Sequence, residues 1–155
     1  MTENGRLVVG ISGASGVVLG IRMLEYLKTK PVQTHLVISP SARKTISLET
    51  DWAFEDVVKL ADRYYGYTDI GGDIASGSFY TAGMVVIPCS IKTLSAVANS
   101  YSQDLLSRAA DVTLKEGRPL LLDASKQARV LDSHRDLCGD GLQELLVFGR
   151  KGADL

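Results

Sequence analysis

Short apolar runs alternate with longer amphipathic segments along most of the chain. The runs are rich in Val, Ile and Leu, which is typical of buried strands, and they cover residues 7–11, 34–38, 84–88 and 119–122. Between them, apolar residues recur every three or four positions and predict helices over residues 17–27, 41–50, 54–61, 91–97 and 105–112. Strands that alternate with helices imply right-handed crossovers and a mostly parallel sheet. The pattern therefore predicts an α/β domain.

The remaining segments carry weaker signals. Residues 64–80 are rich in Gly, Asp and Ser and predict an irregular connection with one short strand, while Ser41 is the candidate cap of the helix that follows it. At Asp123 the pattern changes, because residues 123–136 are polar without a clear period and residues 143–148 offer only one more short element. We therefore divide the chain into a domain over residues 1–122 and an atypical segment over residues 123–155.

Composition places the chain among soluble globular proteins. Hydrophobic residues make up 45% and charged residues 23% of the 155 residues, which suits one domain with a buried core. The formal net charge of -1 offers no electrostatic argument for a nucleic acid or an anionic membrane surface as partner. No apolar stretch approaches the roughly 20 residues that a membrane span needs, and the N-terminus lacks the apolar run of a signal peptide.

The two cysteines also inform the setting. Cys89 and Cys138 form no C-x-x-C pair, so they make neither a disulfide framework nor a zinc site. His35 and His134 add no metal-ligand spacing, so we expect no metal. Cys89 follows an apolar run without a histidine nearby in sequence and is interpreted as a buried structural thiol. A reduced, cytoplasmic location is the expectation.

A glycine-rich turn is the strongest local signal. Residues 10–16 read Gly-Ile-Ser-Gly-Ala-Ser-Gly and lie between the first predicted strand and the first predicted helix. Glycines let the backbone approach a ligand, and the start of a helix offers free N–H groups with a partial positive charge, so the turn suits a phosphate. The spacing is neither the dinucleotide-binding G-x-G-x-x-G nor a P-loop. A tight turn without a ligand remains the alternative.

A second turn of the same chemistry follows the third predicted strand. Residues 88–93 read Pro-Cys-Ser-Ile-Lys-Thr and offer hydroxyls, N–H groups and a cation at a strand end. Ser39 closes the second predicted strand. Ligands of open α/β sheets lie beyond the carboxyl ends of the strands. A capped helix start with a solvated lysine explains one such turn, whereas several turns together favour a nucleotide or a flavin.

These motifs, in order, resemble the UbiX-type flavin prenyltransferases, long called aromatic acid decarboxylase subunits and connected with ubiquinone biosynthesis. The resemblance extends from about Leu7 to Leu122 and rests on six segments, which cover residues 9–16, 34–37, 47–51, 76–79, 88–94 and 108–112. It implies a flavodoxin-like, Rossmann-like three-layer sandwich that binds FMN between the subunits of a homo-oligomer, commonly a dodecamer. The implied reaction joins the dimethylallyl group of dimethylallyl phosphate to N5 and C6 of reduced FMN without a metal. The implied product, prenylated FMN, serves a partner UbiD-type decarboxylase.

The resemblance also implies roles for individual residues. Ser15 lies near the flavin N5 region, Glu49 lines the prenyl site from a neighbouring subunit, and Lys115 contacts the phosphate of dimethylallyl phosphate. By spacing alone, Glu49 is a solvated residue at a helix end. The residues that would hold FMN are Gly13, Ala14, Ser15, Ser39, Ser90, Ile91, Lys92 and Thr93.

The family pattern stops at the atypical segment. The family continues with an Arg-Glu-Thr-Pro-Leu segment whose Arg binds FMN and phosphate and whose Glu transfers protons, and later with a phosphate-binding Tyr and a second Arg. The aligned positions here are Ser125 to Arg129, and no tyrosine follows Tyr101. Lys126 and Arg129 supply charge but no carboxylate. The hypothesis at this point is a frameshifted or truncated segment.

Three other functions compete with prenyl transfer. The first is an FMN-binding flavoprotein of the same fold that lacks transfer activity because the Arg-Glu pair is missing. The second is a cysteine-peptide decarboxylase, against which the Ser-Gly-Ser-Phe and Cys-Ser-Ile-Lys-Thr motifs argue. The third is an NAD(P)-dependent reductase, which would need an acidic residue where Ser39 closes the second strand.

Overall fold

A twisted sheet forms the centre of the protein in the computed structural model, which describes residues 5–124 and 145–148. Within these residues the sheet has six strands in the order β3-β2-β1-β4-β5-β6. The strands are β1 (Gly5–Ile11), β2 (Val32–Ile38), β3 (Arg63–Tyr65), β4 (Gly83–Val86), β5 (Leu120–Asp123) and β6 (Leu145–Phe148). All neighbouring pairs are parallel except β5 and β6, which pair antiparallel. The prediction of a mostly parallel sheet is confirmed.

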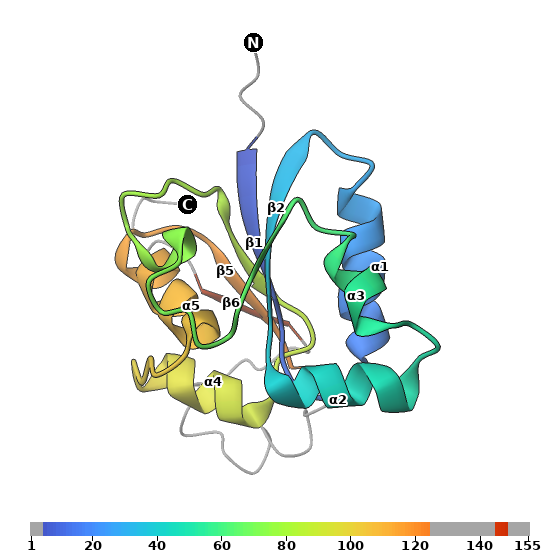
Figure 1. Ribbon diagram of the computed structural model, residues 1–155. Coiled ribbons are helices and arrows are strands. Elements are labelled where there is room, and N and C mark those ends of the chain that lie inside the picture. The colour runs from blue at the N-terminus through green and yellow to red at the C-terminus, as the bar shows by residue number, and fades with distance from the viewer. Residues whose placement is uncertain (1–4, 125–144, 149–155) are drawn as a thin grey trace.

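Helices cover both faces of this sheet (Figure 1). One face carries α1 (Val17–Leu27), α2 (Pro40–Glu49) and α3 (Phe54–Val58); the other carries α4 (Ile91–Ala98), α5 (Leu105–Lys115) and the short 3₁₀ helix η1 (Asp73–Ala75). Each face buries its own apolar cluster, because successive side chains of a strand point to opposite faces. In β1, for example, Val9 and Ile11 pack toward α1, while Val8 packs toward α5. The structure confirms the three-layer α/β, flavodoxin-like fold.

The strand order creates a switch point between β1 and β4. From β1 the chain moves outward through α1 to β2 and then to β3, and it later returns to lie on the other side of β1 as β4. Connections that leave two adjacent parallel strands in opposite directions open a crevice beyond their carboxyl ends, where ligands bind in such folds. The glycine turn follows β1 and the Ser90 turn, residues 88–93, follows β4, so both lie at the switch point, where such a crevice is expected; this region is called the crevice below.

The element boundaries differ from the sequence prediction at several points. Ser39, not Ser41, caps α2: its Oγ accepts the Ala42 N–H at 3.1 Å, and Pro40 occupies the first turn, where its missing N–H costs nothing. Helix α3 ends at Val58 instead of residue 61, since the chain must already turn there to begin β3. The predicted irregular connection contains that one short strand and the η1 helix.

Part of the atypical segment joins the sheet. Strand β6 lies within residues 143–148, where one more short element was predicted, and it pairs with β5 from Leu120↔Phe148 to Asp123↔Leu145. The division of the chain at residue 122 stays a prediction. The positions that carry the departure from the family pattern, such as Lys126 and Arg129, lie outside the described residues, as do His134 and Cys138. Within residues 5–124 and 145–148, no helix has the length and apolar character for a membrane crossing.

Candidate functional site

The glycine turn and the Ser90 turn are in direct contact. The Ser90 N–H donates to Ser12 Oγ at 2.7 Å, and Ser12 Oγ donates to the Pro88 carbonyl at 3.0 Å. The Ser12 N–H donates to the same carbonyl at 3.2 Å. Two segments more than 70 residues apart in sequence therefore form one wall of the crevice at the carboxyl ends of β1 and β4.

The glycine turn has a backbone that only small residues allow. Gly16, the N-cap of α1, has φ 95°, a left-handed conformation that side chains rarely adopt. A Cβ on Gly13 would overlap the side chain of Ser41. Ala14 is buried, whereas Ser15 is exposed, with its hydroxyl available to a ligand at the start of α1. This close approach of backbone to its surroundings is what an anion site at a helix start requires.

The Ser90 turn is a capped helix start. Ser90 Oγ accepts the Thr93 N–H at 3.2 Å and donates to Thr93 Oγ1 at 3.1 Å, so α4 begins in a fixed position. Ile91 is half-buried, and Lys92 is exposed. Lys92 and Thr93 line a cavity of about 590 Å³ between α4, α5 and the chain after β3. That volume lies within the range of small-molecule sites.

Ser39 directly follows β2, at the same carboxyl ends of the parallel strands as the other two turns. Its N–H donates to the Ile11 carbonyl at 2.9 Å, which ties the end of β2 to the end of β1. Its Oγ caps α2 and contacts Ser41 Oγ at 3.1 Å. Thus the structure brings together all eight residues predicted to hold FMN, on three adjacent turns.

Glu49 approaches the glycine turn of its own chain. Its Oε2 accepts the Gly16 N–H at 3.1 Å. Helix α1 has no side-chain cap from Gly16 and no acidic residue in its first turn, so the Glu49 carboxylate is the anion that meets the partial positive charge of its N-terminus. The predicted position in a neighbouring subunit's prenyl site stays a prediction, while the contact within one chain places Glu49 beside Ser15.

Lys115 does not join this cluster. It lies in the last turn of α5, close to where β5 begins, and β5 pairs there with the start of β4. The glycine turn and the Ser90 turn follow the opposite ends of the strands. The Lys115 ammonium lies 3.7 Å from the Glu116 carboxylate. Within one chain Lys115 is therefore a strand's length from the crevice, and its contact with a donor phosphate stays a prediction.

Sequence reasoning did not single out Ser12 as a site residue. Ser12 is only 1% exposed and has three of the bonds that hold the two turns together. The one signal in the sequence was a polar residue directly after a buried strand, which describes many strand ends equally well. Cys89, in contrast, is as expected: it is fully buried, and burial together with the nearby Asp123 raises the pKa of its thiol to about 12, so it stays protonated at neutral pH.

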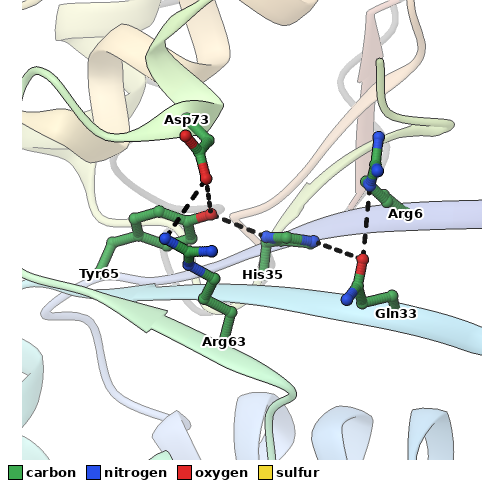
Figure 2. Close-up of polar contacts among 6 residues, drawn as sticks. All are labelled: Arg6, Gln33, His35, Arg63, Tyr65 and Asp73. Carbon is green, nitrogen blue, oxygen red and sulfur yellow. Dashed lines mark hydrogen bonds and ion pairs between the residues drawn. The ribbon is translucent and has the colours of Figure 1, made fainter. Parts of the chain in front are cut away.

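A second polar cluster lies outside the crevice, on the face of the sheet that α5 covers (Figure 2). His35 is 2% exposed; its Nδ1 lies 3.0 Å from the Tyr65 hydroxyl and its Nε2 lies 3.2 Å from Gln33 Oε1. The Tyr65 hydroxyl donates to Asp73 at 3.4 Å, and Arg6 Nε donates to Gln33 Oε1 at 3.4 Å. These contacts satisfy the polar atoms of a buried imidazole.

The surroundings of His35 predict an acid-sensitive fold. Burial, and then the charges of Arg6 and Arg63, lower the pKa of His35 below its usual 6.5, and they outweigh the opposing carboxylates of Asp62 and Asp73. The unfolded chain therefore binds more protons than the folded one below about pH 6.5. The free energy of unfolding should fall as the pH drops from 7 toward 5, by at most about 1.4 kcal/mol per pH unit.

Urea denaturation at several pH values measures this dependence. A His35→Gln variant keeps a hydrogen-bonding side chain that does not titrate, so its stability should change less between pH 7 and 5 than that of the wild type. Equal slopes for both proteins would contradict the role given to His35.

Comparison with known proteins adds an independent observation. The Flavoprotein family matches residues 1–130. Flavin prenyltransferase UbiX of Escherichia coli (strain K12) is 56% identical over 118 residues, which are 76% of this chain and 62% of the relative. A probable UbiX-like flavin prenyltransferase of Streptomyces sp. (strain D7) is 44% identical over 151 residues, 97% of this chain and 72% of the relative. The chain thus spans less than two thirds of the E. coli relative and nearly three quarters of the Streptomyces one.

Solved structures agree with this comparison. AnUbiX (PadA1) in complex with FMN and dimethylallyl pyrophosphate has a TM-score of 0.75 and 46% sequence identity, over 76% of this chain and 62% of the other. A dodecameric FMN-dependent Ubix-like decarboxylase from Escherichia coli O157:H7 also has a TM-score of 0.75, with 42% identity over 85% of this chain and 76% of the other.

Proposed function

The chain belongs to the Flavoprotein family and, within it, to the UbiX-like flavin prenyltransferases, and from this premise we propose that it is an enzyme that prenylates reduced FMN. The donor is dimethylallyl phosphate or the corresponding pyrophosphate, the molecule bound in AnUbiX. The dimethylallyl C1 carbon would bond to N5 as its bond to the phosphate oxygen breaks and N5 loses its proton. A second bond would then form between C3 and C6 as C2 of the double bond takes up a proton and C6 loses one, so that phosphate (or pyrophosphate) and, in total, one proton leave. When bound, FMN supplies the nucleophilic N5 and C6 atoms.

The observation that carries the proposal is the contact of the two turns at the switch point. Ser12 Oγ and the Ser90 N–H lie 2.7 Å apart, so two helix starts, those of α1 and α4, face one crevice. Both helix starts carry a partial positive charge that favours an anion, and at α1 the Glu49 carboxylate of the same chain already accepts the Gly16 N–H. The residues present therefore fit FMN: Gly16 has the left-handed backbone that lets the turn enter α1, Ser15 adds an exposed hydroxyl, and Lys92 adds a cation.

The chain's own residues have distinct tasks in this proposal. Ser39, Ser90 and Thr93 fix the three turns through their capping bonds, so the ligand meets a preorganised surface. Lys92, exposed in the first turn of α4, opposes the charge of a phosphate. Glu49, 3.1 Å from Gly16 N, is the carboxylate placed to hold or move a proton beside Ser15.

Assembly and partners are part of the same proposal. The chain forms a homo-oligomer, a dodecamer by analogy with the E. coli O157:H7 structure. The prenylated FMN passes to a UbiD-type decarboxylase, which acts on an aromatic acid. The cytoplasmic location expected from the sequence stays a prediction.

Two measurements on the purified chain test the proposal. The absorption spectrum should show bound FMN, and incubation with reduced FMN and either donor should give a product heavier than FMN by one dimethylallyl unit, seen by mass spectrometry. A control without donor should leave FMN unchanged. Bound FMN without product would support the flavoprotein that lacks transfer activity, and a colourless protein that ignores added FMN would refute both.

A further inference from the structure

We propose that Ser12 is a positioning residue for the flavin site, which sets the distance and angle between the glycine turn and the Ser90 turn. The inference rests on the proposed FMN site and deepens it, because it names the single side chain that couples the two helix starts. Ser12 belongs to the glycine turn but is only 1% exposed, so it acts through its neighbours and not by touching the ligand.

The geometry singles out the Ser12 hydroxyl. It accepts the Ser90 N–H at 2.7 Å and donates to the Pro88 carbonyl at 3.0 Å. Both its donor and its acceptor function are therefore used between the turn after β1 and the turn after β4. The Ser12 backbone N–H adds a third bond, to the same Pro88 carbonyl at 3.2 Å. The Ser90 bond is at the short end of the usual N–H···O range and part-buried, so it is well placed to hold the two segments in register.

The other capping bonds of the site do not connect the glycine turn to the Ser90 turn. Ser90 Oγ is bonded to Thr93, within α4, and Ser39 Oγ is bonded to Ala42 and Ser41, within α2. These bonds order each helix start by itself. The Ser39 N–H to Ile11 carbonyl bond ties β2 to β1, on the other side of the glycine turn. Among the described residues, the hydrogen bonds between the glycine turn and the Ser90 turn all involve Ser12.

Removal of the hydroxyl has a specific consequence. In a Ser12→Ala chain the part-buried Ser90 N–H loses its acceptor, and it must turn toward water or stay unsatisfied. Ser90 is the N-cap of α4, so this movement shifts the start of α4 relative to the glycine turn. A ligand that bridges both turns then meets only one of them in the right place.

The test compares two variants that each lose one buried hydroxyl. Thr113→Val is the control, because Thr113 is 3% exposed and its hydroxyl donates to the Ala109 carbonyl at 2.7 Å, within α5. We expect Ser12→Ala to raise the FMN dissociation constant by about tenfold or more and Thr113→Val to leave it within about twofold. Both should lower the thermal midpoint of the ligand-free protein to a similar extent.

Two readouts separate positioning from general destabilisation. The visible circular dichroism of bound FMN should change in Ser12→Ala at saturating FMN and stay as in wild type in Thr113→Val. Amide exchange in the ligand-free protein should accelerate over residues 88–93 in Ser12→Ala alone. If the wild-type protein binds FMN and Ser12→Ala binds it equally, with unchanged dichroism and amide exchange, this inference is overturned and the proposed function stands. If the wild-type protein does not bind FMN, both the inference and the proposed function are overturned.

Discussion

Replacing Gly20 with alanine is expected to lower the free energy of unfolding by about 2 kcal/mol, although alanine is the better helix former. Gly20 lies inside α1, where the exchange would by propensity alone stabilise the protein by about 1 kcal/mol. However, a Cβ at this position would overlap the Ile87 carbonyl oxygen and lie 2.9 Å from Ile11 Cδ1. Forcing one carbon into such a packed site costs up to about 3 kcal/mol, so the packing cost exceeds the propensity gain.

Urea denaturation measures the change in the free energy of unfolding. Its sign shows whether the packing cost or the gain in helix propensity is larger. Gly71→Ala is the matched control, because Gly71 is exposed and the nearest atom to its added Cβ is Asp69 Oδ1 at 3.8 Å, an ordinary contact. The control should change the stability by less than about 0.5 kcal/mol. A Gly20→Ala chain as stable as wild type, or more stable, would mean that α1 does not pack against the end of β4 as described.

The same substitution should also weaken the flavin site. Ile87 directly precedes Pro88, whose carbonyl accepts both bonds from Ser12. A shift of Ile87 away from α1 therefore moves the Ser90 turn relative to the glycine turn. We therefore expect a loss of FMN affinity to accompany the loss of stability in Gly20→Ala.

Replacing Glu49 with glutamine is expected to lower the rate of prenyl transfer by about 100-fold or more, with FMN affinity nearly unchanged. The carboxamide keeps an oxygen that accepts the Gly16 N–H, so the contact now 3.1 Å long can persist. Glutamine cannot take up or release a proton under these conditions, and general acid–base groups contribute about 10²- to 10⁴-fold. The exchange thus separates the proton-transfer role of Glu49 from its role as the anion at the start of α1.

Single-turnover assays with reduced FMN and dimethylallyl phosphate measure the effect. Glu55→Gln serves as the control, because Glu55 is an exposed residue of α3 whose carboxylate lies 3.8 Å from Arg43, an ion pair of small energetic value. Its transfer rate should equal that of wild type. Full activity in Glu49→Gln would restrict Glu49 to holding the helix start and would leave the proton-transfer step to another group.

The fold followed from the order of apolar runs, because burial on both faces makes each parallel strand a nearly continuous apolar segment. The runs at residues 7–11 and 34–38 became β1 and β2, and the alternation with helices indicated the parallel sheet. The error at the start of α2 has a local cause: capping rules locate a helix start within a few residues, and Ser39 and Ser41 satisfy them almost equally. Only the bond from Ala42 N–H to Ser39 Oγ decides between them.

The sequence by itself determined which residue types could meet a phosphate, since glycines and hydroxyls at strand ends are local features of the chain. It did not determine that the glycine turn and the Ser90 turn touch or that Glu49 reaches Gly16. Nor did it determine that Lys115 lies at the opposite ends of the strands from these turns. Those facts depend on strand order and on which side of β1 each crossover returns. Contacts between distant segments form only when the whole sheet is assembled, and so the tertiary structure alone placed the hydroxyl of Ser12 between the two turns.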